Sequence, residues 1–172
     1  MLKGEKVYLR LLELRDIGIL KYICNDNNIK KYNTISNNED ENEISKPRKA
    51  LSIINEKDVL VGFLTYKESN KYEKVFSIGI TIASRYWNRG YGQDSIRLLI
   101  EYLFEELEAI KVQLEVIKYN IRAIACYEKC GFIEEFQKKG ICYLDGKCVD
   151  TIIMGILKEE FMKRKVKLER WG

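Results

Sequence analysis

The most regular pattern of hydrophobic residues in this chain lies between residues 91 and 107. Hydrophobic side chains recur there at the three- and four-residue spacing that places them on one face of an α-helix. They are Ile96, Leu99, Ile100, Leu103 and Leu107. The run from Phe76 to Ile82 before them is strand-like. The segment Tyr86 to Gln93, with its two glycines, therefore lies where a strand gives way to a helix.

Shorter patterns predict the elements before this helix. Val7 to Leu12 alternates as a strand does, and Asp16 is the expected N-cap of a helix from Ile17 to Cys24. The hydrophobic stripe of that helix is Ile19, Leu20 and Ile23. The polar stretch Asn25 to Glu43, which Pro47 terminates, reads as loop plus a short helix. Strands are then expected at Ala50–Ile54, Val59–Tyr66 and Val75–Ile82, with turns at Asn55–Asp58 and Ser69–Lys74.

The elements after the long helix are equally well marked. Val112 to Ile117 predicts a strand, and Asn120 and Gly131 are the expected N-cap and C-cap of a further helix. Phe132–Tyr143 and Lys147–Leu157 predict a final hairpin. The order of these elements predicts an α+β fold in one domain of residues 1–172. Its mixed, mostly antiparallel sheet has about seven strands, with helices on both faces.

Composition narrows the class of protein. The chain has 172 residues, of which 46% are hydrophobic and 33% charged, which suits a soluble domain with a real core. It has no hydrophobic run long enough for a membrane span and no signal peptide, so a cytoplasmic location is expected. A net charge of +4 does not by itself indicate a nucleic-acid partner. Five cysteines without an export signal favour reduced thiols.

The sequence contains no histidine, which excludes Ser-His-Asp, Cys-His and the usual zinc hydrolase chemistry. Any acid–base chemistry must come from Asp, Glu, Tyr, Lys, Cys or water. Cys126 and Cys130 stand four residues apart on a predicted helix, and we expect them to be small core residues rather than a metal pair. In a two-residue hairpin at Asp145-Gly146, Cys148 pairs with Tyr143 rather than Cys142, which disfavours a disulfide.

The two glycines Gly90 and Gly92 suit an anion. The free N–H groups of a first helical turn point outward, the helix dipole is positive there, and glycine lets a phosphate come close. A plain tight turn is the alternative interpretation. The segment lacks the Gly-Lys-Ser/Thr of a Walker loop and the third glycine of a dinucleotide-binding turn.

Three ordered blocks resemble the GNAT N-acetyltransferases, and the resemblance covers nearly the whole chain. The first, Trp87 to Gly92, looks like the acetyl-CoA pyrophosphate loop, although Trp87 stands where the general pattern has Gln or Arg. The second runs from Leu114 to Phe132. The third, Asp145 to Leu157, resembles the last hairpin of the ribosomal-protein N-acetyltransferase branch, in which that Trp is common.

The resemblance implies acetyl-CoA as cosubstrate, an amine as acceptor and no metal. The pantetheine arm would pair with Ile80, Thr81 and Ile82 in a gap between this strand and Val112–Ile117. Backbone N–H groups of Arg89, Gly90, Tyr91, Gly92 and Gln93, with the Arg89 side chain, would hold the pyrophosphate. Asn120 would cap its helix and touch the pantetheine.

The resemblance also suggests catalytic roles. Tyr127 is the expected acid for the departing thiolate. Glu115 is either the base, directly or through water, or a structural partner of a backbone amide. Asp94 stands in the first helical turn, where a carboxylate favours the dipole and needs no catalytic role.

The acceptor is left open by the sequence. A protein N-terminus follows from the branch resemblance, whereas the acidic stretch Glu39–Glu43 is either a solvated surface or a rim for a polyamine or aminoglycoside-like cation. The basic tail Lys158–Arg170 is a solvated helix or an arm for an acidic partner. A non-catalytic acyl-CoA-binding or sensing module is the alternative function. By family analogy the last hairpin, residues 132–157, forms a homodimer.

Overall fold

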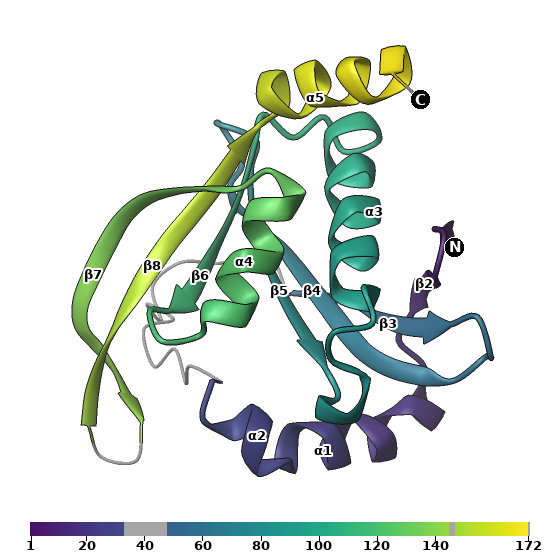
Figure 1. Ribbon diagram of the computed structural model, residues 1–172, viewed down its shortest axis with the longest axis vertical. Helices are drawn as coiled ribbons and strands as arrows, with labels where there is room; N and C mark the ends of the chain where they lie inside the picture. Colours follow the sequence, from purple (N-terminus) through teal and green to yellow (C-terminus); the bar gives the residue numbers. More distant parts are fainter. Residues whose placement is uncertain (33–47, 145–146, 172) are drawn as a thin grey trace.

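A computed structural model describes residues 1–32, 48–144 and 147–171 of the chain. Its centre is one eight-stranded sheet in the order β1-β2-β3-β4-β5-β6-β8-β7 (Figure 1). The strands are β1 Leu2–Lys3, β2 Val7–Leu11, β3 Lys49–Asn55, β4 Leu60–Asn70, β5 Val75–Ile82, β6 Lys111–Ile117, β7 Ile133–Leu144 and β8 Lys147–Leu157. The prediction of about seven strands missed β1, because a two-residue strand carries no periodic signal.

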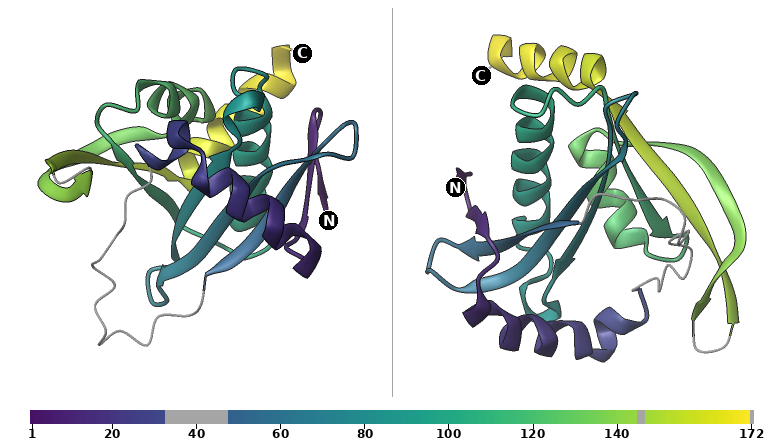
Figure 2. Two further views of the ribbon diagram at one scale, coloured as in Figure 1. Left: turned by 90° about the horizontal axis from the view of Figure 1, so that it is seen from below. Right: turned by 180° about the vertical axis from the view of Figure 1, so that it is seen from behind.

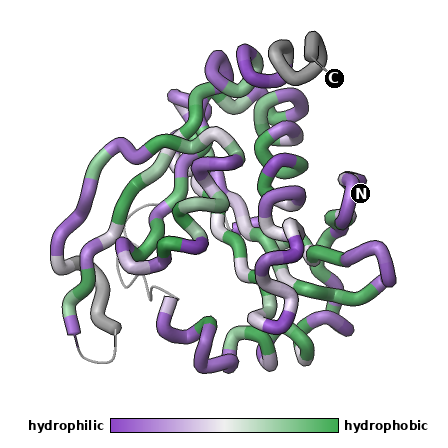
Figure 3. The backbone as a smooth tube through the Cα atoms, in the orientation of Figure 1, coloured by the Kyte–Doolittle hydropathy of each residue, from purple (hydrophilic) through white to green (hydrophobic). Residues whose placement is uncertain are grey.

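The helices lie on both faces of this sheet, as predicted. They are α1 Ile17–Asn25, α2 Asn27–Lys30, α3 Tyr91–Glu105, α4 Ile121–Cys130 and α5 Lys158–Trp171. On one face α3 and α4 cover the main core, and on the other α1 and α2 cover a smaller one (Figure 2). The hydrophobic run of β8 passes into a mainly hydrophilic α5 at the end of the sheet (Figure 3). The basic tail is therefore helical, as expected.

The main core follows the periodicity that predicted it. Ile96, Leu99, Ile100 and Leu103 of α3 are fully buried. The helix ends at Glu105, two residues before the expected end, and Leu107 packs against the core from the following loop. The caps of α4 are also confirmed: the Asn120 side chain accepts a hydrogen bond from the Ala123 N–H, and Gly131 adopts a left-handed φ of 103°.

Asp16 occupies the predicted N-cap position of α1, but its side chain makes no capping hydrogen bond to that helix. Its buried carboxylate instead accepts two hydrogen bonds from the Arg10 guanidinium, at 2.7 and 2.8 Å. Ile19 was likewise assigned to the buried stripe of α1, yet it is 43% exposed. A helix that covers only one edge of the sheet buries a narrower face, here Leu20 and Ile23.

One further boundary differs from the prediction, and one strand register agrees with it. The turn expected at Ser69–Lys74 is shorter, because β4 continues to Asn70. In the last hairpin Tyr143 pairs with Cys148 and Cys142 with Val149, as the two-residue turn predicted. The turn itself, the acidic stretch Glu39–Glu43 and Pro47 lie outside the described residues.

The sheet divides where β5 meets β6. All other neighbouring strands are antiparallel, but β5 and β6 are parallel and pair at only three positions: Val75 with Lys111, Phe76 with Val112 and Ser77 with Gln113. Beyond Ser77 the two strands separate (Figure 1). The facing edge of β5 therefore has no strand partner in the described chain from Ile78 to Ile82, while its other edge stays paired with β4 as far as Gly62.

Candidate active site

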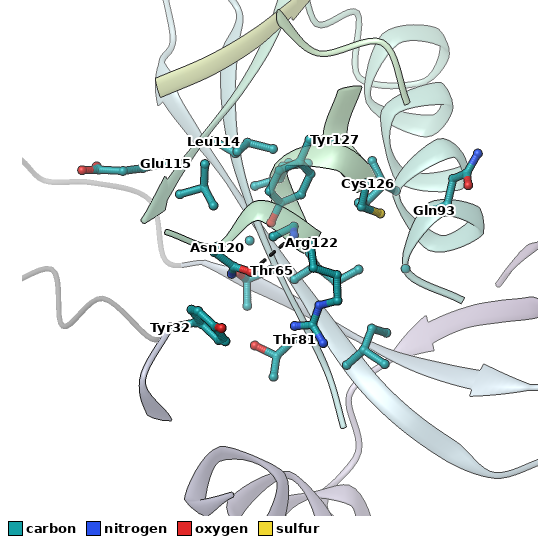
Figure 4. Close-up of a pocket in the computed structure, with 18 of the residues that line it drawn as sticks. Tyr32, Thr65, Thr81, Gln93, Leu114, Glu115, Asn120, Arg122, Cys126 and Tyr127 are labelled. Carbon is teal, nitrogen blue, oxygen red and sulfur yellow. Dashed lines mark hydrogen bonds between the residues drawn. The ribbon is translucent and has the colours of Figure 1, made fainter. Parts of the chain in front are cut away.

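The opening between β5 and β6 is one cleft of about 970 Å³. Its walls come from both strands, from the loop before α3 and from α4 (Figure 4). All the expected site residues line it. They are Ile80, Thr81, Ile82, Arg89, Gly90, Tyr91, Gly92, Gln93, Glu115, Asn120 and Tyr127. The structure thus brings together residues that the sequence separates into three blocks.

The open edge of β5 presents backbone groups to this cleft. The N–H of Ala83 donates to Val61 O of β4, at 2.9 Å. Backbone groups alternate from side to side along a strand, so the N–H groups of Ile82 and Ile80 point away from β4 and into the opening. Such an edge can pair with an extended, amide-containing arm in the manner of an added strand.

The beginning of α3 forms a second wall. Gly90 is the N-cap, with a left-handed φ of 84°. The first helical N–H that finds its acceptor in the helix is that of Asp94, which donates to Gly90 O at 3.0 Å. The preceding N–H groups of Tyr91, Gly92 and Gln93 have no acceptor in the helix. Together with the helix dipole they make a site for an oxyanion.

The two glycines of this loop have different reasons to be glycine. A Cβ at Gly90 would lie 2.8 Å from the Lys6 Nζ, in a backbone conformation that other residues avoid. A Cβ at Gly92 would find ordinary contacts, 3.6 Å from the Cys126 Sγ and 3.8 Å from Ile82. The backbone at residue 90 therefore favours glycine, whereas Gly92 leaves the cleft beside the helix N-terminus open.

Arg89 and Asp94 flank the same turn but have different roles. The Arg89 guanidinium lies 5.5 Å from the centre of the Tyr86 ring and adds positive charge to the cleft wall. The Asp94 carboxylate accepts hydrogen bonds from the N–H groups of Lys6, at 2.8 Å, and Val7, at 3.0 Å. Asp94 thus fastens the N-terminal segment to α3.

Tyr127 enters the cleft from α4. Its side chain is 7% exposed, its ring meets that of Phe132 edge-on, with centres 6.1 Å apart, and its hydroxyl points into the cavity on the side of Asn120 (Figure 4). Burial raises the pKa of this phenol above its usual range. The hydroxyl therefore stays protonated at every pH at which the protein is expected to work, as a proton donor must.

The oxygen and the nitrogen of the Asn120 side-chain amide face different surroundings. Its Oδ1 accepts from the Ala123 N–H at 3.3 Å and caps α4. Its amide nitrogen has no hydrogen-bond partner among the described residues, and the side chain lines the cleft. An amide N–H₂ held in this way can donate to a carbonyl group in the cavity.

Glu115 lies on β6 with its carboxylate directed away from Tyr127 (Figure 4). One carboxylate oxygen accepts from the Thr151 hydroxyl at 2.5 Å, and the other pairs with the Lys138 ammonium at 3.3 Å. Thr151 belongs to β8 and Lys138 to β7. An incoming amine would therefore have to reach Glu115 through water or displace the Lys138 contact.

Trp87 and Arg122 also shape the cleft, and the sequence did not predict a contact for either side chain. The Trp87 indole nitrogen donates to the Ile82 carbonyl oxygen at 2.7 Å, and the Arg122 guanidinium lies 3.0 Å above the Trp87 ring. The only available signals were that Trp87 departs from the general family pattern and that Arg122 stands in the first turn of a capped helix. Neither signal reveals that the two side chains meet.

The cysteines divide between core and cleft. Cys130 is buried and its thiol donates to Gln93 O over 3.6 Å, as expected of a small core residue. Cys126, on the same helix, is only partly buried and lines the cleft. Among the described residues there is no group of three or more histidine, cysteine, aspartate or glutamate side chains that could hold a metal ion. No described helix is long and apolar enough to cross a membrane.

Comparisons with known proteins agree on one family. The sequence profile of the acetyltransferase (GNAT) family matches residues 19–132. A spermidine N(1)-acetyltransferase of Vibrio cholerae is 25% identical over 170 residues, which cover 94% of this chain and 98% of the relative. A prophage-derived, uncharacterised N-acetyltransferase of Bacillus subtilis is 24% identical over 165 residues, covering 92% and 93%.

Solved structures agree on the fold. A crystal structure of spermidine N-acetyltransferase from Vibrio cholerae in complex with CoA and spermine superposes with a TM-score of 0.77 at 22% sequence identity. The match covers 91% of this chain and 98% of the other. The expected α+β fold is confirmed by this likeness.

Proposed function

The chain belongs to the acetyltransferase (GNAT) family and is an N-acetyltransferase, and from that premise we propose that it transfers the acetyl group of acetyl-CoA directly to a primary amine. The observation that carries this proposal is the parting of β5 from β6 after Ser77. It opens one cleft in which an unpaired strand edge, a helix N-terminus and a buried phenol face the same space.

The cleft residues fit acetyl-CoA. The edge from Ile80 to Ile82 would pair with the amides of the pantetheine arm, and the free N–H groups of Tyr91, Gly92 and Gln93 would hold the pyrophosphate with help from Arg89. The space beside Gly92, which a Cβ would occupy, suits the close approach of a phosphate. When bound, acetyl-CoA supplies the thioester carbonyl that the amine attacks.

The chain's own groups then handle charge and protons. The N–H of Ile82 points into the opening and would donate to the oxygen on which negative charge develops. Tyr127 would give its proton to the departing sulfur, since its burial keeps the phenol protonated until the thiolate forms beside it. An alkylammonium has a pKa near ~10 and must lose a proton before it attacks.

Glu115 is the proposed acceptor of that proton, directly or through water. It is the one carboxylate among the described residues that line the cleft. Its hydrogen bond from Thr151 and its ion pair with Lys138 also support the alternative, in which Glu115 holds β6, β7 and β8 in register and the base is water.

The acceptor amine has two candidates. A protein N-terminus is supported by the likeness of residues 145–157 to the ribosomal-protein branch. A polyamine or similar cation is supported by the name of the Vibrio cholerae relative and by the acidic stretch Glu39–Glu43 in the sequence. The stretch has four carboxylates, those of Glu39, Asp40, Glu41 and Glu43. Replacing them by amides would raise the KM for a cationic acceptor, whereas an unaffected KM would show that the stretch does not bind the substrate.

A homodimer is proposed through the last hairpin. β7 is an edge strand of the sheet and carries two large exposed hydrophobic residues, Ile133 at 50% and Phe136 at 52% exposure. Exposed hydrophobic groups on a strand edge favour association with another sheet. A monomer in light scattering would contradict this.

The experiment that tests the function is release of free thiol from acetyl-CoA across a panel of amines. The panel holds N-terminal peptides, polyamines, aminoglycosides and free amino acids, and mass spectrometry identifies the acetylated product. Transfer to any primary amine supports the proposal. Binding of acetyl-CoA without transfer to any of them would favour a binding or sensing module instead.

A further inference from the structure

The face of the sheet opposite α3 and α4 forms the second half of the cleft. Leu64, Ile78 and Leu114 belong to the main core beneath α3 and α4. Side chains alternate along a strand, so their neighbours project to the other face. Those that line the cleft there are Phe63, Thr65, Lys67, Ser77, Thr81 and Gln113. An acceptor that enters from this face would meet the thioester from the side away from α3 and α4.

The described lining of the cleft carries an excess of positive charge. Its described lining contains six cationic side chains and one carboxylate, that of Glu115. The Lys138 ion pair already neutralises Glu115. Arg89 lies before α3 and Lys129 in the last turn of α4. This leaves Arg48, Lys67 and Arg122, of which Arg122 stands in the first turn of α4 and extends into the cleft (Figure 4). None of these three has an ion-pair partner in the part of the chain that the structure describes.

Arg122 is the most unusual of the three. Its Nη1 is buried and makes no hydrogen bond, whereas buried polar atoms nearly always have a partner. The guanidinium points toward Thr81 and Tyr32, away from Gln93 at the start of α3 (Figure 4). Burial lowers the pKa of this group, because a desolvated cation without a counter-charge is unfavourable. No described residue therefore supplies an anion beside Arg122.

We propose, building on the acetyl transfer proposed above, that the acceptor is an amine that also carries a carboxylate or phosphate, and that Arg122 binds this anion in a cleft whose lining also includes Lys67 and Arg48. A bidentate guanidinium–oxyanion contact would satisfy the buried Nη1. The ring of Trp87 fixes the plane of the guanidinium from one side, so the anion is received at the edge that carries the N–H groups. A polyamine would meet positive charge at the same position, which no described carboxylate compensates.

A matched set of short amines tests this on the unmodified protein. β-Alanine, β-alaninamide and 1,3-diaminopropane have similar skeletons that end in an anion, a neutral amide and a cation, and phosphoethanolamine supplies the phosphate. Compared at equal concentrations of free base, kcat/KM is expected to be higher by about tenfold or more for the two anionic amines than for the amide, because a charge-assisted contact is gained. A preference for the diamine would overturn the inference while leaving acetyl transfer intact.

Substitution of the cationic cleft residues tests where the anion of the acceptor binds. Arg122→Met is expected to raise the KM for β-alanine by about tenfold and to change that for β-alaninamide by less than about twofold, with Arg122→Lys restoring part of the difference. Lys67→Met acts in the same direction and provides a second test if Arg122→Met folds poorly. Lys21→Met removes an exposed lysine of α1 and serves as the control.

The affinity for acetyl-CoA shows whether Arg122 binds an anion of the acceptor or a phosphate of CoA. If Arg122→Met weakens acetyl-CoA binding and slows every acceptor equally, Arg122 binds a phosphate of CoA, and the inference is wrong. If no amine releases thiol although acetyl-CoA binds, the proposed transfer itself fails, and the inference fails with it. Only an acceptor-dependent effect at constant acetyl-CoA affinity supports it.

Discussion

The indole nitrogen of Trp87 donates a hydrogen bond to the main-chain carbonyl oxygen of Ile82, with the two atoms 2.7 Å apart. This contact joins the loop before α3 to the last residue of β5. Ile82 lies on the open edge of the strand, so Trp87 uses its carbonyl oxygen and leaves its N–H free toward the cleft. The departure from the general family pattern at this position thus has a structural consequence.

Replacing Trp87 by Phe keeps an aromatic face for Arg122 but removes the donor. Loss of one such hydrogen bond costs about 1 kcal/mol, and we expect the Kd for acetyl-CoA to rise by about fivefold as the loop loosens. Isothermal titration with acetyl-CoA measures this. Trp87→Leu also lacks the donor and should raise the Kd to a similar extent; an unchanged Kd in Trp87→Phe would refute this account of the hydrogen bond.

Tyr127→Phe tests the proton donor. The variant keeps the ring against Phe132 but removes the hydroxyl, so turnover is expected to fall by about a hundredfold, within the range of general acid catalysis. The Kd for acetyl-CoA should change little. Because burial raises the pKa of Tyr127, the wild-type rate should show no alkaline decline from this group below pH ~10. Unchanged turnover in the variant would remove Tyr127 from the acid role.

Glu115→Gln separates a base from a structural residue. The amide retains the size of the side chain but loses the ion pair with Lys138. If Glu115 accepts the proton, kcat should fall by about tenfold or more. Thr151→Val is the matched comparison, since it removes the hydroxyl partner and leaves the carboxylate. Equal losses of kcat in both variants would indicate a structural role.

Local sequence features predicted the elements of this fold well, but long-range contacts decide the site. The period of Ile96 to Leu103 predicted α3, and Asn120 and Gly131 predicted both ends of α4, because each signal lies within one or two helical turns. The partners of Glu115 come from β7 and β8, 23 and 36 residues away. No spacing in the sequence shows that contact, nor the point at which β5 and β6 separate.

Gly92→Ala should weaken acetyl-CoA binding, whereas Gly90→Ala should lower the stability of the fold. The Cβ of the first variant meets only ordinary contacts, so stability should be nearly unchanged. The methyl group would, however, enter the space proposed for the pyrophosphate, and the Kd for acetyl-CoA should rise by about tenfold or more. Gly90→Ala should lower the unfolding free energy by about 1 kcal/mol or more, because of the left-handed φ of 84° and the close Lys6 Nζ. Unaltered acetyl-CoA binding by Gly92→Ala would argue against a phosphate beside this residue.

The ion pair of Asp16 and Arg10 holds the N-terminal strand to the first helical segment. Asp16 is 3% exposed and also accepts from the Ser52 hydroxyl at 2.7 Å and the Glu13 N–H at 2.9 Å. These contacts stabilise the charged form. The Arg10 hydrogen bonds, which act against the desolvation of the carboxylate, hold its pKa well below the ordinary value of 3.8.

A depressed pKa fixes the direction of the pH dependence. The contribution of Asp16 to stability is complete above the unfolded-state value near ~3.9 and is lost as the pH falls below it. Asp16→Asn leaves Arg10 with only the more exposed Glu13 as an ion-pair partner and should cost about 3 kcal/mol at pH 7, with a shallower loss of stability on acidification than in the wild type. Urea unfolding between pH 7 and pH 3 measures both effects. Glu13→Gln, at the exposed end of the same cluster, should cost less than about 1 kcal/mol. Equal costs for the two variants would mean that burial does not strengthen the Asp16 contact.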